Sequence, residues 1–143
     1  MTEQSVYIVK PEAFAHRDEI RRRIAERGIC VIAFAEVTLP TWVGVELYPE
    51  APAALLAATA RFLCHSPVEM GAVRAENALR RLEDLVGHDV NPVRCTRGTL
   101  RFRFGERNPD RTFGVAYFFN GIHCSRSANE VGRDLAIFAR LNR

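Results

Sequence analysis

Short apolar runs alternate with amphipathic segments along the chain, a pattern that indicates a mixture of strands and helices. An uninterrupted apolar run, Val6–Val9, ends at Lys10 and a proline, and it predicts a central strand with Lys10 at its mouth. Residues 29–39 are rich in β-branched and aromatic side chains and predict a second strand. Residues 68–75 and 115–119 are the third and fourth strand candidates.

The amphipathic segments predict four helices. Apolar residues recur at helical spacing among the charges from Asp18 to Arg27, and a glycine then ends the helix. The last helix is expected to begin near Ser127, which stands three residues before Glu130 as in a capping box. The four helices are expected at residues 18–27, 53–63, 76–86 and about 127–140.

Two segments are predicted to be loops. Residues 41–52 carry enough Pro and Gly for a loop, with at most a weak helical turn at 45–48, and residues 88–114 predict a long irregular loop. The resulting order of strands and helices predicts an α+β fold, a ferredoxin-like α/β sandwich. In it a four-stranded antiparallel sheet carries helices packed on one face. We expect one domain over residues 1–143.

The composition is that of an ordinary globular protein, with 48% hydrophobic and 26% charged residues. No apolar run is long enough to cross a membrane, and the first residues lack the features of a signal peptide, so we expect a cytoplasmic protein. A net charge of +3, with acidic and basic residues interleaved, argues against nucleic-acid binding. The four cysteines include no C-x-x-C pair, which favours free thiols over disulfides or a protein-bound metal.

Lys10 is the only lysine among the 20 basic residues. A bias toward arginine would leave one lysine either by chance or because an arginine cannot replace it. A compact ammonium meets a phosphate differently from a planar guanidinium fork. Lys10 is therefore a candidate for binding an anion.

Polar side chains follow the apolar run of residues 115–119 in quick succession. Asn120, His123 and Ser125 come just before the last predicted helix. A strand before them and a helix after them could hold a reactive imidazole in a fixed position. Cys124 is adjacent to His123, but neighbours on an extended chain point to opposite sides, which argues against a thiol enzyme. The other histidines are expected to be surface or packing residues; they are His16, His65 and His88.

Several motifs occur along the chain in a fixed order, and together they are more specific than any one of them. The chain resembles the nucleoside diphosphate kinase family over essentially its whole length. The segments that carry the resemblance are Tyr7–Phe14, Phe62–Val68, Glu76–Ala78 with Leu85–Gly87, Asn91–Pro92 with Arg97–Arg101, and Asn120-x-x-His123-x-Ser125-x-Ser127.

The resemblance implies a ping-pong phosphotransferase. His123 would take the γ-phosphoryl group of a nucleoside triphosphate and pass it to a nucleoside diphosphate. A neutral imidazole suits this reaction, because it is nucleophilic near pH 7 and its phosphoramidate is labile. The resemblance also implies Mg²⁺, carried mainly by the nucleotide phosphates rather than by protein ligands.

The resemblance further implies roles for residues around the imidazole. Lys10 would neutralise the transferring group, Arg101 would bind phosphate oxygens and Asn120 would bond a sugar hydroxyl. Tyr48, the counterpart of the family's active-site tyrosine, would lie near the ring.

Asp134 stands eleven residues after His123, at the position where the family carries a glutamate that bonds the far ring nitrogen. Aspartate is shorter by one methylene. It could still fix the tautomer directly, or through Ser125 as a relay.

Four departures from the family pattern bear on the substrate. Glu83 stands where the family has a second phosphate-binding arginine, Leu55 replaces the aromatic residue that stacks on the base, and Asp89-Val90 replaces a threonine. Arg126 stands where the family has an aspartate, and it could supply the missing phosphate contact. Other arginines that could reach in are Arg80, Arg81, Arg94 and Arg97.

These departures leave two alternatives open besides an active kinase. The chain could be a weak or inactive member that acts as a binding or scaffold protein, or an enzyme retuned for an unusual nucleotide. The chain ends soon after the last predicted helix, without the tail that braces subunits in many relatives. We therefore expect a homo-oligomer, with a dimer favoured over a hexamer.

Overall fold

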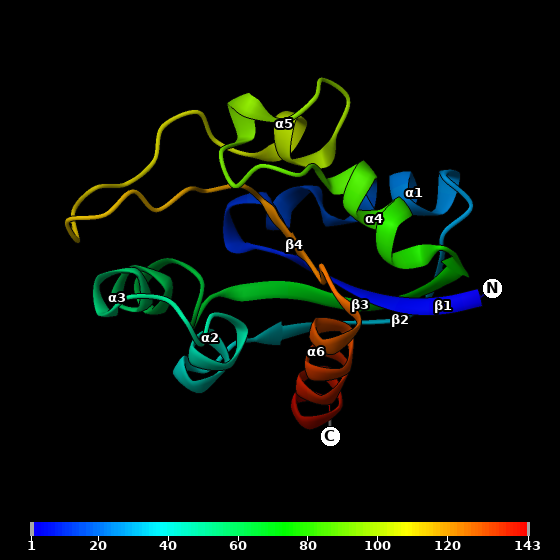
Figure 1. Cartoon of the computed structure of the whole chain (residues 1–143), viewed down its shortest axis with the longest axis horizontal. Helices are drawn as coiled ribbons and strands as arrows, with labels where there is room; N and C mark the ends of the chain where they lie inside the picture. Colours follow the sequence, from blue (N-terminus) through cyan, green and yellow to red (C-terminus); the bar gives the residue numbers. More distant parts are fainter. Residues whose placement is uncertain (1, 143) are drawn as a thin grey trace.

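A four-stranded antiparallel sheet forms the centre of the molecule in the computed structural model, which describes residues 2–142. Its strands lie in the order β2-β3-β1-β4 (Figure 1). The strands are β1 (Thr2–Val9), β2 (Cys30–Thr38), β3 (Pro67–Glu76) and β4 (Ile122–Cys124). Antiparallel pairing between every pair of neighbours confirms the predicted α+β class.

Helices connect these strands and cover the sheet. In chain order they are η1 (Pro11–His16), α1 (Arg17–Glu26), α2 (Thr41–Leu47), α3 (Ala53–Phe62), α4 (Ala78–Val86), η2 (Pro92–Arg94), α5 (Leu100–Phe104) and α6 (Ala128–Leu141). The cap predicted for the last helix is confirmed, because the Ser127 hydroxyl accepts a hydrogen bond from the Glu130 amide at 3.1 Å.

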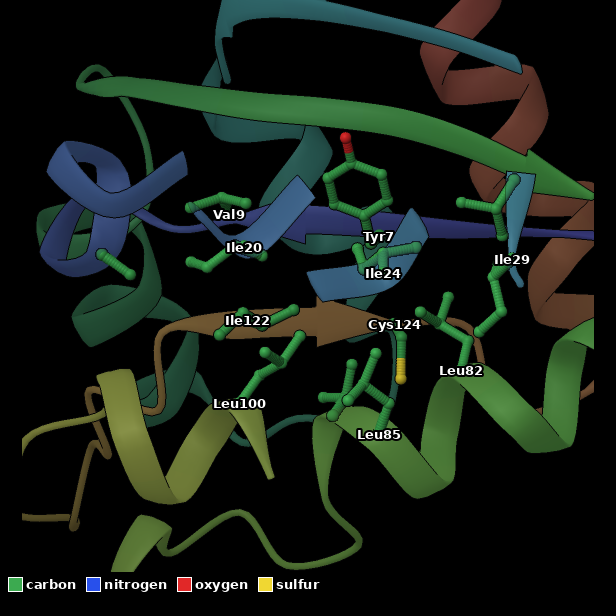
Figure 2. Packing of buried hydrophobic residues seen from close by; sticks show 13 residues of the cluster. Tyr7, Val9, Ile20, Ile24, Ile29, Leu82, Leu85, Leu100, Ile122 and Cys124 are labelled. Carbon is green, nitrogen blue, oxygen red and sulfur yellow. The ribbon is translucent and has the colours of Figure 1, made fainter. Parts of the chain in front are cut away.

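Both faces of the sheet are covered, so the expectation of helices on one face was wrong. Alternate residues of β1 belong to two separate cores, and Val6 to Val9 are all fully buried. On one face, Tyr7 and Val9 pack against α1 and α4 (Figure 2). On the other face, side chains of α2 and α6 pack around Val6 and Ile8, and Figure 1 shows α2 and α6 on that side.

The fourth strand lies later in the chain than predicted. Residues 115–119 form no named strand; Tyr117 makes only an isolated bridge with Asp110. Their aromatic side chains instead pack in a cluster in which Phe62 of α3 contacts Phe113, Tyr117 and Phe119. The chain reaches the sheet only after Gly121, which turns with a φ of 81°.

Two predicted loops contain helix. Residues 41–47 form α2, which replaces the weak turn expected at 45–48 and ends beside Tyr48. The segment 88–114 includes η2 and α5, and the Thr99 side chain caps α5 by accepting a hydrogen bond from the Phe102 amide. α2 and α5 each begin after a residue with extended backbone, and each is too short for helical periodicity to reveal. In the described part of the chain, no helix has the length and apolar character that crossing a membrane requires.

Gly71 of β3 provides a test of the packing under β1. A Cβ atom at this position would lie 2.4 Å from the buried ring of Tyr7. We expect Gly71→Ala to lower the free energy of unfolding by about 1–3 kcal/mol, because the ring has no room to move. Urea denaturation measures this. Gly132→Ala, at an exposed position of α6, is the matched control, since its Cβ would meet nothing within 4 Å. A Gly71→Ala variant as stable as the wild type would contradict this packing.

Candidate active site

The register between β1 and β4 determines which way His123 points. His123 pairs with Ile8, and Cys124 pairs with Tyr7. Ile8 belongs to the core on the α2 and α6 side, whereas Tyr7 and Cys124 belong to the core beneath α1 and α4. The imidazole and the thiol therefore lie on opposite faces of the sheet, and His123 faces α2 and α6.

Asp134, on α6, binds the far side of the imidazole. Its Oδ2 lies 3.2 Å from His123 Nε2 and accepts a hydrogen bond from the Ser125 hydroxyl at 2.7 Å. Its Oδ1 accepts a hydrogen bond from Arg133 Nε at 2.9 Å. The aspartate thus reaches the ring directly as well as bonding Ser125, and no relay is needed. The contact requires a proton on Nε2, which leaves the lone pair on Nδ1.

Burial and charge set the protonation state of both partners. Burial is the largest cause that lowers the pKa of His123, and the nearby Asp134 opposes it, while Lys10 and Arg101 lower the pKa further. Burial alone would raise the pKa of Asp134, but hydrogen bonds from His123, Ser125 and Arg133 together hold it below its usual value. The pair is therefore a neutral imidazole beside a carboxylate at neutral pH.

The Nδ1 side of His123 faces a cavity of about 200 Å³. The Tyr48 hydroxyl lies 3.5 Å from Nδ1, and the two rings meet edge to face. The cavity is also lined by Arg101, Asn120 and Arg126. A larger hollow of about 630 Å³ between α1 and β2 holds no histidine, so the cavity at His123 is the candidate site.

Two buried cations lie close to the imidazole. Arg101 is 5% exposed, and its Nε and Nη1 donate hydrogen bonds to the carbonyls of Ile122, Gly87 and Asp89. Lys10 is 4% exposed. Within residues 2–142, neither cation has a carboxylate partner. Arg101 lines the cavity at His123, whereas Lys10 lines the cavity that adjoins it. A buried charge without a counter-charge is costly, so both side chains favour a nearby anion.

A second, mostly apolar cavity of about 190 Å³ adjoins the first and shares Tyr48, Val90 and Asn120 with it. Leu55 lines this second cavity. The Asn120 amide donates to the Val90 carbonyl, but its buried Oδ1 has no hydrogen-bond partner among the described residues. That oxygen can accept a hydrogen bond from a ligand hydroxyl that spans the two cavities.

Glu83 and Arg126, two of the positions that depart from the family, form an ion pair. Arg126 Nε lies 3.0 Å from Glu83 Oε2, and Nη2 donates to the His88 carbonyl at 3.0 Å. Among the arginines considered from sequence, Arg126 lines the cavity, whereas Arg80, Arg81, Arg94 and Arg97 do not.

Sequence reasoning missed three residues that shape the site. Arg133 binds the outer oxygen of Asp134, and Glu12 accepts a hydrogen bond from the Gly121 amide at 2.9 Å, which fixes the turn into β4. Tyr117 lines the apolar cavity. Glu12 lies within a segment that carries the resemblance, but nothing in its spacing indicates a partner 109 residues away.

Histidines outside the cavity have other contacts. His65 bonds Thr41 at 2.9 Å, His88 bonds Asp84 at 2.7 Å, and His16 stacks near Phe104. Among residues 2–142, no three His, Cys, Asp or Glu side chains gather as a metal site.

The fold is that of a known class of enzymes. The Borrelia burgdorferi nucleoside-diphosphate kinase, solved as a transition-state mimic with vanadate and ADP, superposes with a TM-score of 0.84 at 18% identity, covering 96% of this chain and 86% of that one. A nucleoside diphosphate kinase family protein from Babesia bovis superposes with a TM-score of 0.78 at 27% identity, covering 95% of this chain and 87% of that one.

Sequence comparison assigns the family. The pattern that defines the family described as nucleoside diphosphate kinase matches residues 3–142. The nucleoside diphosphate kinase of Mycobacterium marinum is 25% identical over 141 residues, which are 96% of this chain and 97% of that protein. This chain belongs to the nucleoside diphosphate kinase family.

The lowered pKa of His123 is testable by NMR. At pH 6.5, where an ordinary histidine is half protonated, we expect the His123 ring to be mostly neutral, because burial disfavours the imidazolium. The unfolded chain then takes up this proton first, so His123 reduces the free energy of unfolding as the pH falls from about 6.5 to its depressed pKa. Ring ¹⁵N shifts, assigned with His123→Gln, measure the midpoint. A midpoint at or above 6.5 would contradict the prediction.

Proposed function

We propose that this protein is a phosphotransferase that moves the γ-phosphoryl group of a nucleoside triphosphate to a nucleoside diphosphate through phosphohistidine at His123. The observation that carries the proposal is the orientation of the ring. Asp134 occupies Nε2, and Nδ1 faces Tyr48 in a cavity with Arg101 and Arg126. A positioned nucleophile among cations is what phosphoryl transfer needs.

The reaction would proceed in two balanced half-reactions. The lone pair of His123 Nδ1 forms a bond to the γ-phosphorus while the bond to the β-phosphate oxygen breaks, and the diphosphate leaves. A terminal oxygen of the acceptor diphosphate then attacks the phosphohistidine, and the ring regains its lone pair. Throughout, the proton stays on Nε2 and is hydrogen-bonded to Asp134. The carboxylate of Asp134 stabilises the positive charge that develops on the ring.

The other site residues fit the two ends of a nucleotide. Lys10 and Arg101 would stabilise the charge on the transferring group, and Arg126 would bind a phosphate farther out. Asn120 would accept a hydrogen bond from a sugar hydroxyl, since its Oδ1 is otherwise unpartnered among residues 2–142. Leu55 would contact the base in the apolar cavity.

Magnesium would enter with the substrate, bound to nucleotide phosphate oxygens, where it neutralises part of their charge. Asp134, the acidic side chain that touches the imidazole, is already bound by His123, Ser125 and Arg133. That a homodimer forms in the cytoplasm stays a prediction.

One departure supports an alternative, an enzyme retuned for an unusual nucleotide. Leu55, in place of the family's stacking aromatic residue, offers the base a flexible aliphatic contact rather than a flat ring. A scaffold without turnover is the remaining alternative.

Incubation with γ-labelled ATP tests the mechanism. We expect an acid-labile, alkali-stable label on the wild type, because a phosphoramidate is stable in alkali, and complete loss of that label in His123→Ala. His16→Ala is the matched control, since His16 is exposed and outside the cavity. Absence of label at any nucleotide concentration would favour the scaffold, and label without transfer to ordinary diphosphates would favour the retuned enzyme.

Removal of the buried ammonium tests the charge stabilisation. We expect Lys10→Met, which keeps the stem and removes the charge, to slow phosphorylation of His123 about 10²–10³-fold, the usual effect of losing one preorganised donor at a reacting group. Single-turnover quenched-flow kinetics measure the rate. Arg22→Met, at an exposed position of α1, removes one positive charge elsewhere and should leave the rate unchanged. Equal rates in Lys10→Met and wild type would remove Lys10 from the mechanism.

A further inference from the structure

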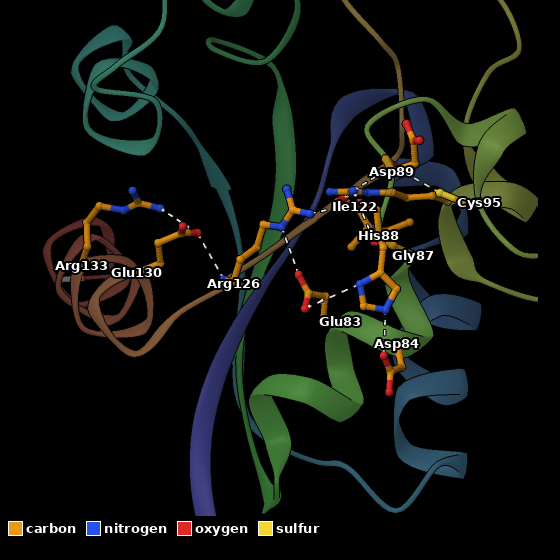
Figure 3. Close-up of polar contacts among 11 residues, drawn as sticks. Glu83, Asp84, Gly87, His88, Asp89, Cys95, Ile122, Arg126, Glu130 and Arg133 are labelled. Atoms are coloured by element: carbon orange, nitrogen blue, oxygen red, sulfur yellow. Dashed lines mark hydrogen bonds and ion pairs between the residues drawn. The ribbon is translucent and has the colours of Figure 1, made fainter.

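Arg126 is the half-exposed cation of the His123 cavity, and its position is fixed from outside that cavity. Its side chain is 44% exposed, and a free arginine side chain has many rotamers to lose on binding. Here Nε is bonded to Glu83 and Nη2 to the His88 carbonyl, while the Arg126 amide donates to Glu130 (Figure 3). Among residues 2–142, no hydrogen bond uses Nη1.

Glu83 lies behind Arg126 and does not line the cavity. Its side chain is 21% exposed, its Oε2 binds Arg126, and its Oε1 lies 3.7 Å from His88 Nδ1. The guanidinium of Arg126 therefore neutralises the carboxylate, and the His88 ring lies near its other oxygen. An anion in this arrangement need not repel a phosphate, because the guanidinium stands between them.

We propose that Glu83 is a positioning residue for the phosphate end of the site. It holds the Arg126 guanidinium so that the free Nη1 can bind a nucleotide phosphate that does not react. This inference rests on the proposed function and deepens it. Glu83, which in the sequence stands in place of a phosphate-binding arginine, would instead orient the arginine that binds the phosphate, Arg126.

Glu83 could act in two ways, and the effect of its removal on nucleotide binding distinguishes them. If Glu83 acts through Arg126, its removal weakens nucleotide binding, and it no longer does so once Arg126 is gone. If Glu83 acts only as a negative charge near the site, its removal strengthens nucleotide binding whether or not Arg126 is present. A role in stability alone would change unfolding without changing KM.

A double-mutant cycle on the full chain decides between them, with KM for Mg²⁺-ATP and the single-turnover phosphorylation rate as readouts. We expect Arg126→Ala to raise KM about ten- to hundredfold, the effect of one charge-assisted hydrogen bond. Glu83→Ala should raise KM about three- to tenfold, since it frees the guanidinium without removing it. Both should leave the saturated rate within about threefold of wild type, because the contact is to a phosphate that does not react.

The double variant and the conservative variant complete the cycle. Glu83→Ala/Arg126→Ala should have a KM no higher than that of Arg126→Ala alone, and Glu83→Gln, which keeps an acceptor for Nε, should recover part of the loss. Glu26→Ala, which breaks the exposed Arg22–Glu26 pair of α1, is the matched control and should leave KM unchanged. Urea denaturation of each variant shows that it is folded under the assay conditions.

Three results would contradict the proposal that Glu83 positions Arg126. A lower KM in Glu83→Ala, an unchanged KM, or additive effects in the double variant would each show that Glu83 does not act through Arg126. Calorimetric binding of Mg²⁺-ADP to the same variants repeats the cycle without turnover. If the wild type takes no label on His123, the proposed phosphotransfer fails, but the binding cycle still supports or overturns the role of Glu83.

Discussion

One buried carboxylate, that of Asp134, determines the geometry of the candidate site. It is fully buried, so it needs hydrogen bonds to remain ionised, and it takes them from His123, Ser125 and Arg133. The same contacts that stabilise the charge orient the imidazole. Because Nε2 is bound to Asp134, the unprotonated Nδ1 points toward Tyr48 and the cavity.

The electrostatics of the cavity follow from what surrounds this ring. Lys10 and Arg101 are buried, and the hydrogen bonds of Arg101 go to carbonyl groups, which orient the guanidinium without neutralising it. Burial lowers the pKa of His123 most, and the positive charges of Lys10 and Arg101 lower it further, so the ring is kept neutral. A cavity lined by fixed cations and a neutral imidazole favours an anionic ligand, and the adjoining, mostly apolar cavity, which Lys10 also lines, favours a ligand with an apolar end.

Local patterns in the sequence predicted much of this arrangement. The unbroken apolar run of Val6–Val9 correctly predicted a central strand, but we expected helices on one face of the sheet and the strand is buried on both. The Ser127 cap indicated the start of α6. The apolar run at 115–119 was misleading, because side chains that bury against Phe62 look the same in sequence as side chains that bury in a sheet. Hydrophobicity reports that a residue is buried, and it does not report what covers it.

The sequence by itself determined the kinds of chemistry available: an imidazole shortly after an apolar run, one lysine at the end of a predicted strand, and an aspartate on the last predicted helix, all in motifs that resemble one family. Which of these groups meet was decided by tertiary structure. The β1–β4 register turned His123 toward α6, and the packing of α4 beside β4 joined Glu83 to Arg126 across 43 residues. Contacts between distant segments depend on how helices and strands pack, which no local spacing encodes.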